Sequence, residues 1–183
     1  MKLIVLDRDG VINEDSDNYI KTPEEWVPIE GSLEAIARLH HAGYRIVVAT
    51  NQSGLGRGLF TLDTLVAIHK KMHTMVQEAG GALDGIFFCP HTPEDDCNCR
   101  KPKAGLMHDI ERRLGTSLKG IPVVGDSLRD LESAWAVGAE PVLVRTGKGE
   151  RTLKDHRDRL EGVPIDDCLY AYVDRLLSQH ATG

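Results

Sequence analysis

The chain has 183 residues, 41% of them hydrophobic and 27% charged, and a net charge of −6 at pH 7. This length suits a single domain with its own core, and the composition is too apolar for a disordered chain. The acidic balance argues against a general affinity for nucleic acid or for an anionic membrane, and so favours neither kind of partner.

The first residues, MKLIVLDRDG, reach an acidic side chain too early to form the apolar core of about 7 to 15 residues found in signal peptides. Apolar runs elsewhere fall well short of the roughly 20 residues that cross a bilayer. We therefore expect a cytoplasmic protein, in which clustered cysteines indicate a metal site more often than a disulfide.

Short apolar runs alternate with amphipathic helical patterns along the chain. The predicted strands cover residues 3–6, 44–49, 86–89, 121–124 and 142–144, and the predicted helices cover 32–42, 62–78, 106–114, 128–137 and 167–177. Strands that are apolar throughout and separated by single helices indicate a parallel sheet covered on both faces. The pattern predicts one three-layer α/β/α, Rossmann-like domain over residues 1–183.

Two of the helices carry clear local signals. Ser32 suits the N-cap of the first helix, and Gly43 suits the position just after its end. In the second helix, residues at i, i+3 and i+4 spacing mark a core-facing stripe: Leu62, Leu65, Val66, His69, Met72 and Val76.

Polar residues that could take part in catalysis or ligand binding follow four of the predicted strands. Ligands of an open parallel sheet bind at the carboxyl ends of its strands, so we expect these side chains to surround one crevice. They are Asp7 and Asp9 after the first strand, Thr50 and Asn51 after the second, Arg100 and Lys101 after the third and its loop, and Asp126 after the fourth.

This combination favours phosphoryl transfer with a metal ion. Carboxylates crowded into a small site need a cation, and hard oxygen ligands suit Mg²⁺. An aspartate with an ordinary pKa of about 3.9 is ionised at neutral pH and can attack phosphorus without a base. A second carboxyl two residues on could protonate the leaving oxygen and later take a proton from water.

Four short motifs name a family. DRDG, TNQSG, RKP and GDSLRD, at residues 7–10, 50–54, 100–102 and 125–130, resemble in order the four motifs of the haloacid dehalogenase-like (HAD-like) phosphohydrolases. The resemblance implies that Asp7 is the nucleophile and Asp9 the general acid and base, and that Thr50 and Lys101 hold the phosphoryl group. It also implies Mg²⁺ bound by the Asp7 carboxylate, the Asp9 main-chain carbonyl and the Asp126 carboxylate, with Asp130 or the segment at Ser127 supporting that corner.

Three of the four cysteines lie close together with a histidine in the loop at residues 89–99. Cys89, His91, Cys97 and Cys99 form the Cys₃His set of a closed structural Zn²⁺ site, which leaves no open position for catalysis. The spacing differs from the usual C-x₂-C finger, so free thiols, or redox chemistry between Cys97 and Cys99, remain alternatives. The loop has few apolar residues, and a metal could order it in place of a core.

The intervals between the motifs leave no room for a separate cap domain, since helices, strands and the cysteine loop already fill them. A HAD-like chain without a cap domain that carries CPH and CxCRKP, as this one does, resembles the D-glycero-D-manno-heptose 1,7-bisphosphate phosphatases. The histidinol-phosphate phosphatases are a closely related group. The resemblance implies removal of the C7 phosphate of a small phosphorylated sugar, for nucleotide-activated heptose synthesis. It implies substrate contacts from Arg100, from Asp15 and Tyr19, and from Asn51, Gln52 and Ser53.

Other classes of function remain open. A histidinol-phosphate phosphatase is the nearest alternative, and a non-catalytic, zinc-stabilised binding module is one of another class. A phosphotransferase would need a second nucleotide-binding element, which we do not find. We expect a monomer, because no additional dimerisation segment stands out.

Several weaker patterns carry no function at this stage. GLGRG at residues 54–58 and GKGE at 147–150 lack the spacing of nucleotide-binding loops, and we expect the first to form a flexible turn. His69 and His73 lie one helical turn apart without the glutamate of a zinc-protease motif, so we interpret them as ordinary helix-face residues. Cys168 is expected to be a small buried residue of the last helix.

Overall fold

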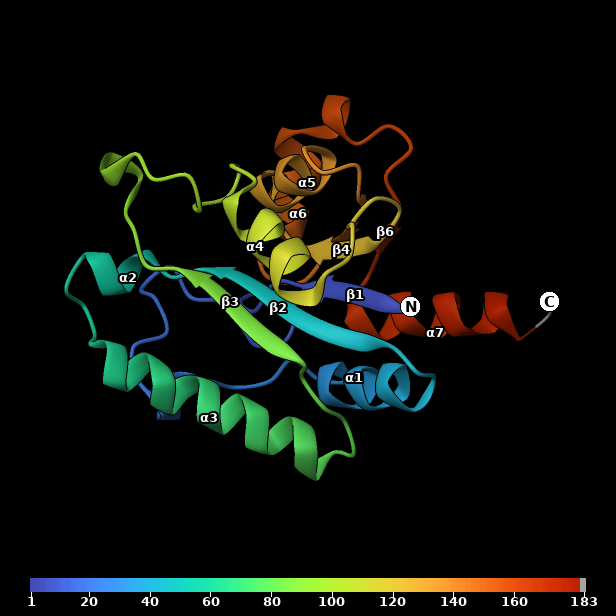
Figure 1. Cartoon of the computed structure of the whole chain (residues 1–183), viewed down its shortest axis with the longest axis horizontal. Coiled ribbons are helices and arrows are strands. Elements are labelled where there is room, and N and C mark those ends of the chain that lie inside the picture. The colour runs from blue at the N-terminus through green and yellow to red at the C-terminus, as the bar shows by residue number, and fades with distance from the viewer. Residues whose placement is uncertain (182–183) are drawn as a thin grey trace.

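A computed structural model describes residues 1–181, and Figure 1 shows a central sheet between two helical layers. The strands are β1 (Leu3–Leu6), β2 (Arg45–Asn51), β3 (Gly85–Cys89), β4 (Pro122–Gly125), β5 (Glu140–Val144) and β6 (Ile165–Asp166). Their spatial order is β3-β2-β1-β4-β5-β6, and each neighbouring pair is parallel. The predicted three-layer, parallel α/β fold is confirmed.

The two faces of the sheet bury different residues of the same strands. Ile4 and Leu6 pack toward α1 (Ser32–His41), α3 (Leu62–Glu78) and α7 (Leu169–His180), whereas Leu3 and Val5 pack toward α4 (Gly105–Leu114). This alternation is the period-2 geometry of a strand with both faces covered. Figure 1 shows the two layers, with α5 (Leu128–Trp135) and α6 (Gly149–Asp155) on the α4 side.

The predicted elements are all present, with ends that shift by up to three residues. The sequence patterns missed β6, α6 and the one-turn helix α2 (Ser53–Gly56), which occupies the start of the GLGRG segment expected to be a turn. The short 3-10 helices at Pro23–Glu25, Pro93–Asp95 and Arg157–Arg159 were also not predicted. All of these are too short to show a periodicity.

Local details correct three of the expectations and confirm a fourth. Gly31, with φ of 83°, caps α1, while the Ser32 hydroxyl donates to the carbonyl of Val11. Leu62 and Val66 of the predicted stripe are more than half exposed, although its other members are buried. Cys168 is partly exposed and caps α7, where its sulfur accepts from the Ala171 N–H. Gly43 does take the left-handed conformation expected after α1, with φ of 86°.

The chain between the strands is short, which confirms that residues 1–181 include no cap domain. The β1–β2 connection contains a 3-10 turn and α1, and the β2–β3 connection contains α2 and α3. The chain reverses its direction of travel across the sheet between β1 and β4, which pair side by side. Ligands of such sheets bind outside the carboxyl ends at this point, where Asp7 and Asp126 follow their strands.

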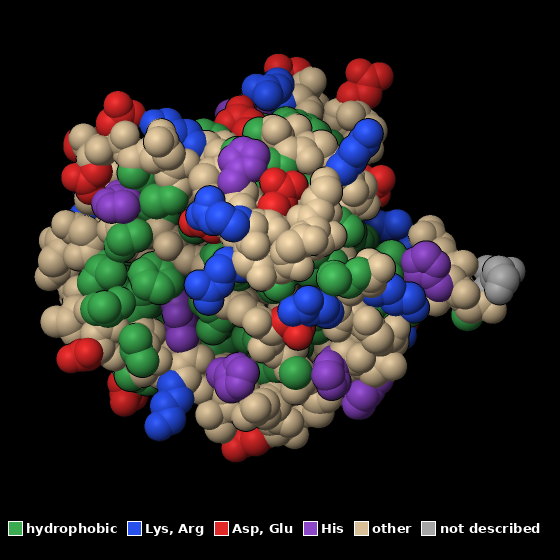
Figure 2. Space-filling model, viewed as in Figure 1, with side chains coloured by type: hydrophobic (Ala, Val, Ile, Leu, Met, Phe, Trp, Pro, Cys, Tyr) green, Lys and Arg blue, Asp and Glu red, His purple; other side chains and the backbone are tan. Residues whose placement is uncertain are grey.

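The visible surface is mixed in character. Figure 2 shows charged side chains of both signs scattered over this face, with hydrophobic side chains gathered on the left near α2 and β3. Among the described residues, no helix combines the length and the apolar character that a bilayer crossing requires. Edge strand β3 is only partly covered from Gly85 to Phe88.

Candidate active site

One pocket, with a volume of about 200 Å³, lies at the carboxyl ends of β1, β2 and β4. All of the predicted catalytic and substrate-binding side chains line it, as does the aspartate after β4: Asp7, Asp9, Asp15, Tyr19, Thr50, Asn51, Gln52, Ser53, Arg100, Lys101 and Asp126. The strand-end rule therefore brings together side chains that are up to 119 positions apart in the chain (residue 7 to residue 126).

Lys101 is the central cation of this pocket, and its side chain is only 3% exposed. Its Nζ donates to Asp7 Oδ1 at 3.1 Å, to Asp130 Oδ1 at 2.6 Å and to the carbonyl of Ala49 at 2.8 Å. The nucleophile candidate and Lys101 are thus in direct contact, as a residue that holds a phosphoryl group beside Asp7 must be.

Asp130 supports the corner rather than facing the pocket as a free ligand. Its Oδ2 accepts from the backbone N–H groups of Asp126 and Ser127 and from the Ser127 hydroxyl, while Oδ1 pairs with Lys101. Burial acts to raise the pKa of Asp130, but the charge and hydrogen bond of Lys101 and the Ser127 donors hold it below the ordinary value. Asp130 therefore keeps its charge and fixes both Lys101 and the turn after β4.

Asp7 and Asp126 fit a divalent cation. Oxygen atoms of Asp7, Asp126 and Asp130 lie within 4.8 Å of one another. Burial and the charge of Asp130 raise the pKa of Asp7 to about 7, against the lowering effect of Lys101, and burial with the charge of Asp7 raises the pKa of Asp126 as well. An ordinary pKa was expected at position 7, whereas burial and Asp130 raise it; a bound cation would lower it and favour the ionised carboxylate.

Glycine is required where the first motif meets Asp126. A Cβ at Gly10 would lie 2.0 Å from Asp126 Oδ2, and Gly10 has φ of +84°. Gly147, from the GKGE neighbourhood, faces the same oxygen and the Gly10 Cα, and the Lys148 N–H donates to Asp126 Oδ2 at 2.8 Å. Two chain segments, at Gly10 and at Gly147–Lys148, thus bring their backbones against one carboxylate, which fixes its direction.

Asp9 is held by several donors. Arg8 donates twice to Oδ1, Asn13 donates to the same oxygen, and Gln52 donates to Oδ2 at 3.0 Å. Burial raises the pKa of Asp9, but the charge of Arg8 and the hydrogen bonds from Asn13, Arg8 and Gln52 outweigh it, so the pKa lies below its usual value. The pKa values of the two aspartates of the first motif are therefore shifted in opposite directions, because hydrogen-bond donors surround Asp9 whereas Asp7 lies beside another carboxylate.

The residues after β2 tie the pocket together. The Asn51 amide forms two hydrogen bonds with the backbone of Lys101, at 3.0 and 3.1 Å. Gln52 Nε2 donates both to Asp9 and to the hydroxyl of the buried Thr50. Asn51 and Gln52, which were predicted to contact substrate, thus have clear positioning contacts, and their contact with substrate stays a prediction.

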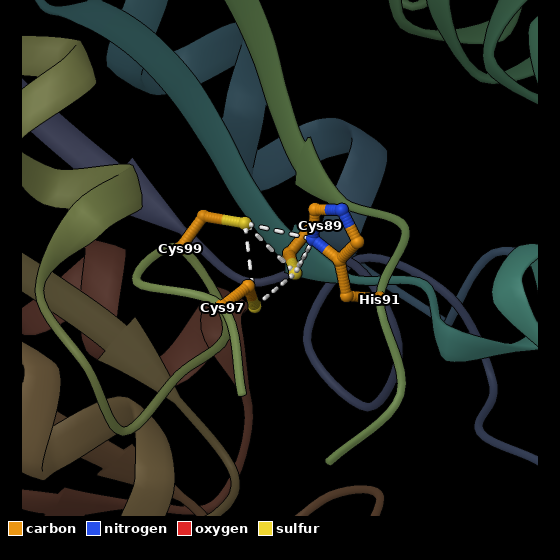
Figure 3. Close-up of side chains that lie close together, drawn as sticks. All are labelled: Cys89, His91, Cys97 and Cys99. Carbon is orange, nitrogen blue, oxygen red and sulfur yellow. Dashed lines mark hydrogen bonds between the residues drawn. The ribbon is translucent and has the colours of Figure 1, made fainter. Parts of the chain in front are cut away.

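The cysteine loop gathers its four predicted ligands at the end of β3. Figure 3 shows the side chains of Cys89, His91, Cys97 and Cys99 pointing toward one another. Five of the six pairs among their sulfur and Nδ1 atoms lie 3.0 to 3.6 Å apart, all four atoms lie within 4.8 Å of one another, and all the thiols are free. Tetrahedral Zn²⁺ with Zn–S of about 2.3 Å needs sulfurs about 3.8 Å apart, so the donor set fits this ion with small shifts.

This cluster is joined directly to the pocket. The backbone N–H of Arg100 lies 3.4 Å from Cys97 Sγ. Burial acts to raise the pKa of Cys97, but this donor and hydrogen bonds from the neighbouring cysteines lower it to about 6, which favours the thiolate that metals bind. The loop thereby fixes the backbone of Arg100.

Three basic residues of the pocket were missed in the sequence. Arg57, Arg129 and Lys148 line it beside Arg100, and within residues 1–181 neither Arg57 nor Arg129 forms an ion pair, whereas Lys148 pairs with Asp15 at 3.4 Å. Arg129 lies inside GDSLRD, while Arg57 and Lys148 belong to GLGRG and GKGE. The position of both glycine-rich segments after predicted strands could have indicated that Arg57 and Lys148 line the pocket. We set these segments aside because their spacing does not match a nucleotide-binding loop.

Known proteins resemble this chain over almost its whole length. A relative from Neisseria meningitidis serogroup A, named D-glycero-beta-D-manno-heptose-1,7-bisphosphate 7-phosphatase, is 50% identical over 182 residues, covering 99% of this chain and 97% of the relative. A Pseudomonas putida protein of the same name is 56% identical over 170 residues, covering 93% of this chain and 94% of its own.

Solved structures agree with these relatives. The D,D-heptose 1,7-bisphosphate phosphatase from B. bronchiseptica, complexed with magnesium and phosphate, has a TM-score of 0.95 and 52% identity, and the match covers 98% of this chain and 99% of that one. The Burkholderia thailandensis enzyme of that name has a TM-score of 0.75 and 47% identity, and the match covers 97% of this chain and 99% of that one.

Family models place the chain more broadly. The model described as HAD-hydrolase-like matches residues 98–167, and the model described as polynucleotide kinase 3 phosphatase matches residues 2–128. The matched regions together include all four motifs on which the resemblance was based. The chain belongs to the HAD-like hydrolases, in the family of the D-glycero-D-manno-heptose-1,7-bisphosphate 7-phosphatases.

Proposed function

We propose that the chain is a Mg²⁺-dependent phosphatase that removes the C7 phosphate of D-glycero-β-D-manno-heptose 1,7-bisphosphate and leaves heptose 1-phosphate. The proposed substrate and its β anomer are supported by the identity of 50 to 56% with relatives named D-glycero-beta-D-manno-heptose-1,7-bisphosphate 7-phosphatase. The pocket supports a phosphoric monoester hydrolase, because a nucleophile, a second carboxyl and a buried lysine converge in it.

The reaction divides into two displacements on phosphorus. An Asp7 oxygen attacks the phosphate while the bond to the sugar oxygen breaks, and Asp9 gives that oxygen a proton. Water then attacks the aspartyl phosphate, Asp9 takes its proton, and phosphate leaves as Asp7 is restored. Lys101 and Thr50 hold the phosphoryl oxygens during both steps.

Mg²⁺ would be held by the Asp7 and Asp126 carboxylates and by the main-chain carbonyl of Asp9. When bound, it would reduce the repulsion between Asp7 and the phosphate. The B. bronchiseptica structure with magnesium and phosphate, at 52% identity, supports this choice of ion. Zn²⁺ in the Cys89, His91, Cys97 and Cys99 cluster would be structural, since four protein ligands complete its coordination.

The unpaired arginines favour a bisphosphate over histidinol phosphate. Arg57, Arg100 and Arg129 line the same pocket as Asp7 and bring positive charge to it. A second phosphate would pair with guanidinium groups, whereas the cationic amine of histidinol phosphate would be repelled by them. The three guanidinium groups thus support a bisphosphate substrate on grounds that are independent of the relatives' names.

A substrate panel tests the assignment. Phosphate release should be measured on the α and β anomers of heptose 1,7-bisphosphate, on heptose 7-phosphate and on histidinol phosphate, each with Mg²⁺. We expect the highest kcat/KM on the β bisphosphate, and a preference for histidinol phosphate would refute the substrate. Asp7→Asn should abolish turnover while the protein stays folded, which also separates an enzyme from a binding module.

We also propose a monomeric enzyme of the cytoplasm with no nucleic-acid or membrane partner, as the composition predicts. The net charge of −6 supports this against a polynucleotide substrate, despite the match to a polynucleotide phosphatase model. Light scattering after gel filtration should give the mass of one chain. Turnover of a 3′-phosphorylated oligonucleotide at a rate near that of the sugar would contradict the proposal.

A further inference from the structure

Arg8 lies between the two aspartates of the first motif, and its side chain is fully buried. Nε and Nη2 donate to Asp9 Oδ1 at 3.0 and 2.8 Å, and Nη1 lies 3.1 Å from Nε2 of His69 on α3. A guanidinium group has donors and no acceptor, so His69 Nε2 must accept this bond. His69 is therefore neutral, with its ring proton on Nδ1.

A neutral acceptor suits this position. His69 is 9% exposed and packs at a tilt against Phe88, with ring centroids 6.1 Å apart. A carboxylate here would compete with Asp9 for Arg8 and bury a second negative charge, whereas an apolar side chain would leave one buried N–H of Arg8 without a partner. Imidazole satisfies that N–H and leaves the charge of Arg8 paired with Asp9 alone.

The two carboxylate oxygens of Asp9 have different surroundings as a result. Oδ1 accepts three hydrogen bonds, two from Arg8 and one from Asn13 at 2.9 Å, and both of these donors are fully buried. Oδ2 accepts one hydrogen bond, from Gln52, and the Asp9 side chain is 24% exposed in the pocket. Oδ2 is the oxygen left to face a substrate.

We propose that Arg8 and His69 are positioning residues that anchor Asp9 by Oδ1, so that Oδ2 is the oxygen that donates and accepts the proton in the reaction. This inference rests on the proposed phosphatase function. Oδ2 gives one proton to the sugar oxygen in the first step and takes one from water in the second, so Asp9 ends each turnover in its starting state. His69 acts through Arg8 and does not touch the reacting atoms.

The leaving group of the substrate tests this role. kcat/KM reports the steps up to cleavage of the ester bond, where a sugar oxygen needs the proton of Asp9 and nitrophenolate, a weak base, does not. In His69→Leu we expect kcat/KM to fall about ten- to a hundredfold on the heptose bisphosphate, as for a displaced catalytic group. On p-nitrophenyl phosphate the same variant should stay within about twofold of the wild type.

Companion variants sharpen the readout. His69→Gln should recover most of the activity, because its side-chain oxygen can accept from Arg8. Asp9→Asn should show the same dependence on the leaving group in a stronger form, since it removes the proton donor itself. His73→Leu lies one turn further along α3, outside the pocket, and should match the wild type on both substrates.

Two results would overturn the inference. A loss in His69→Leu that is equal on both substrates would show that the residue serves only folding, because fewer active molecules lower both rates alike. Full activity of His69→Leu on the bisphosphate would show that the contact with Arg8 is dispensable. If wild-type protein fails to hydrolyse the bisphosphate, the substrate proposal fails; the comparison is then made between p-nitrophenyl phosphate and the best alkyl phosphate of the panel.

Discussion

Replacing Lys101 with methionine separates the two contributions of this lysine, to stability and to catalysis. The substitution keeps a similar volume but leaves the buried carboxylate of Asp130 and the 13%-exposed one of Asp7 without their shared cation, and the Ala49 carbonyl without its donor. Removing one partner of a buried ion pair costs about 3 to 5 kcal/mol. Since domains have about 5 to 15 kcal/mol in total, we expect Lys101→Met to be folded but only marginally stable.

A second substitution should return part of this stability and none of the activity. Asp130→Asn in the Lys101→Met background removes one unpaired charge, while the new amide oxygen can still accept from the Ser127 and Asp126 N–H groups. Residues in contact typically couple by about 0.5 to 3 kcal/mol, so we expect a recovery of that size. Phosphate release should stay absent in both variants, because both lack the lysine that we propose to hold the phosphoryl group.

Urea unfolding followed by circular dichroism, with phosphate release on the same samples, measures both effects. Two outcomes would refute the reasoning. An unfolding free energy of Lys101→Met within about 1 kcal/mol of the wild type would show that the ion pairs of Lys101 with Asp7 and Asp130 stabilise the fold no more than exposed surface ion pairs do. Further destabilisation by Asp130→Asn would show that this carboxylate is held by its backbone donors and not by its charge partner.

Three further predictions concern the metal sites. Gly10→Ala should lower Mg²⁺ affinity at least tenfold in a titration of activity, because its Cβ would displace Asp126, whereas Gly43→Ala, with a similar φ and free space, should only lose about 1 kcal/mol of stability. Because the pKa of Asp7 is raised from 3.8 to about 7, chelated protein should lose stability as pH rises through this window, and the Mg²⁺-induced gain in Tm should grow with pH; a gain independent of pH would contradict this. Elemental analysis should find one Zn²⁺ per chain, lost in Cys97→Ser but retained in Cys168→Ser, and zinc-free wild-type protein purified without chelator would refute the site.

The strand-end rule explains why so much of the site could be predicted from sequence. β1, β2 and β4 each contain a short apolar run, so their approximate ends are visible in the sequence, and the residues that follow these runs must converge in a parallel sheet. β6, by contrast, has two residues, and α6 packs by means of Gly149, whose Cβ would collide with the Val144 carbonyl. A close approach of two backbones leaves no periodic pattern, so such elements could not be found.

Partnerships between buried polar groups are the second kind of feature that the sequence hid. His69 was placed correctly on the core-facing stripe of its helix, between Leu65 and Met72, yet a core position does not name the group that it meets. Its partner, Arg8, lies 61 positions away and is itself in a motif whose arginine has no obvious role. Only the packing of α3 beneath the β1 loop brings the two together.

The zinc loop and the catalytic lysine are less tightly linked than their adjacency in sequence suggests. Lys101 is fixed independently of the cysteines, by two hydrogen bonds between its backbone and Asn51 and by three contacts of its Nζ. Arg100 is different, because its backbone N–H is held by Cys97 Sγ and its side chain forms, within residues 1–181, one hydrogen bond, to the His91 carbonyl at 3.5 Å. Loss of the metal should therefore displace Arg100 before Lys101. We therefore expect loss of zinc from this cluster to raise KM for the bisphosphate through Arg100 and to leave kcat, which depends on Asp7 and Lys101, close to its original value.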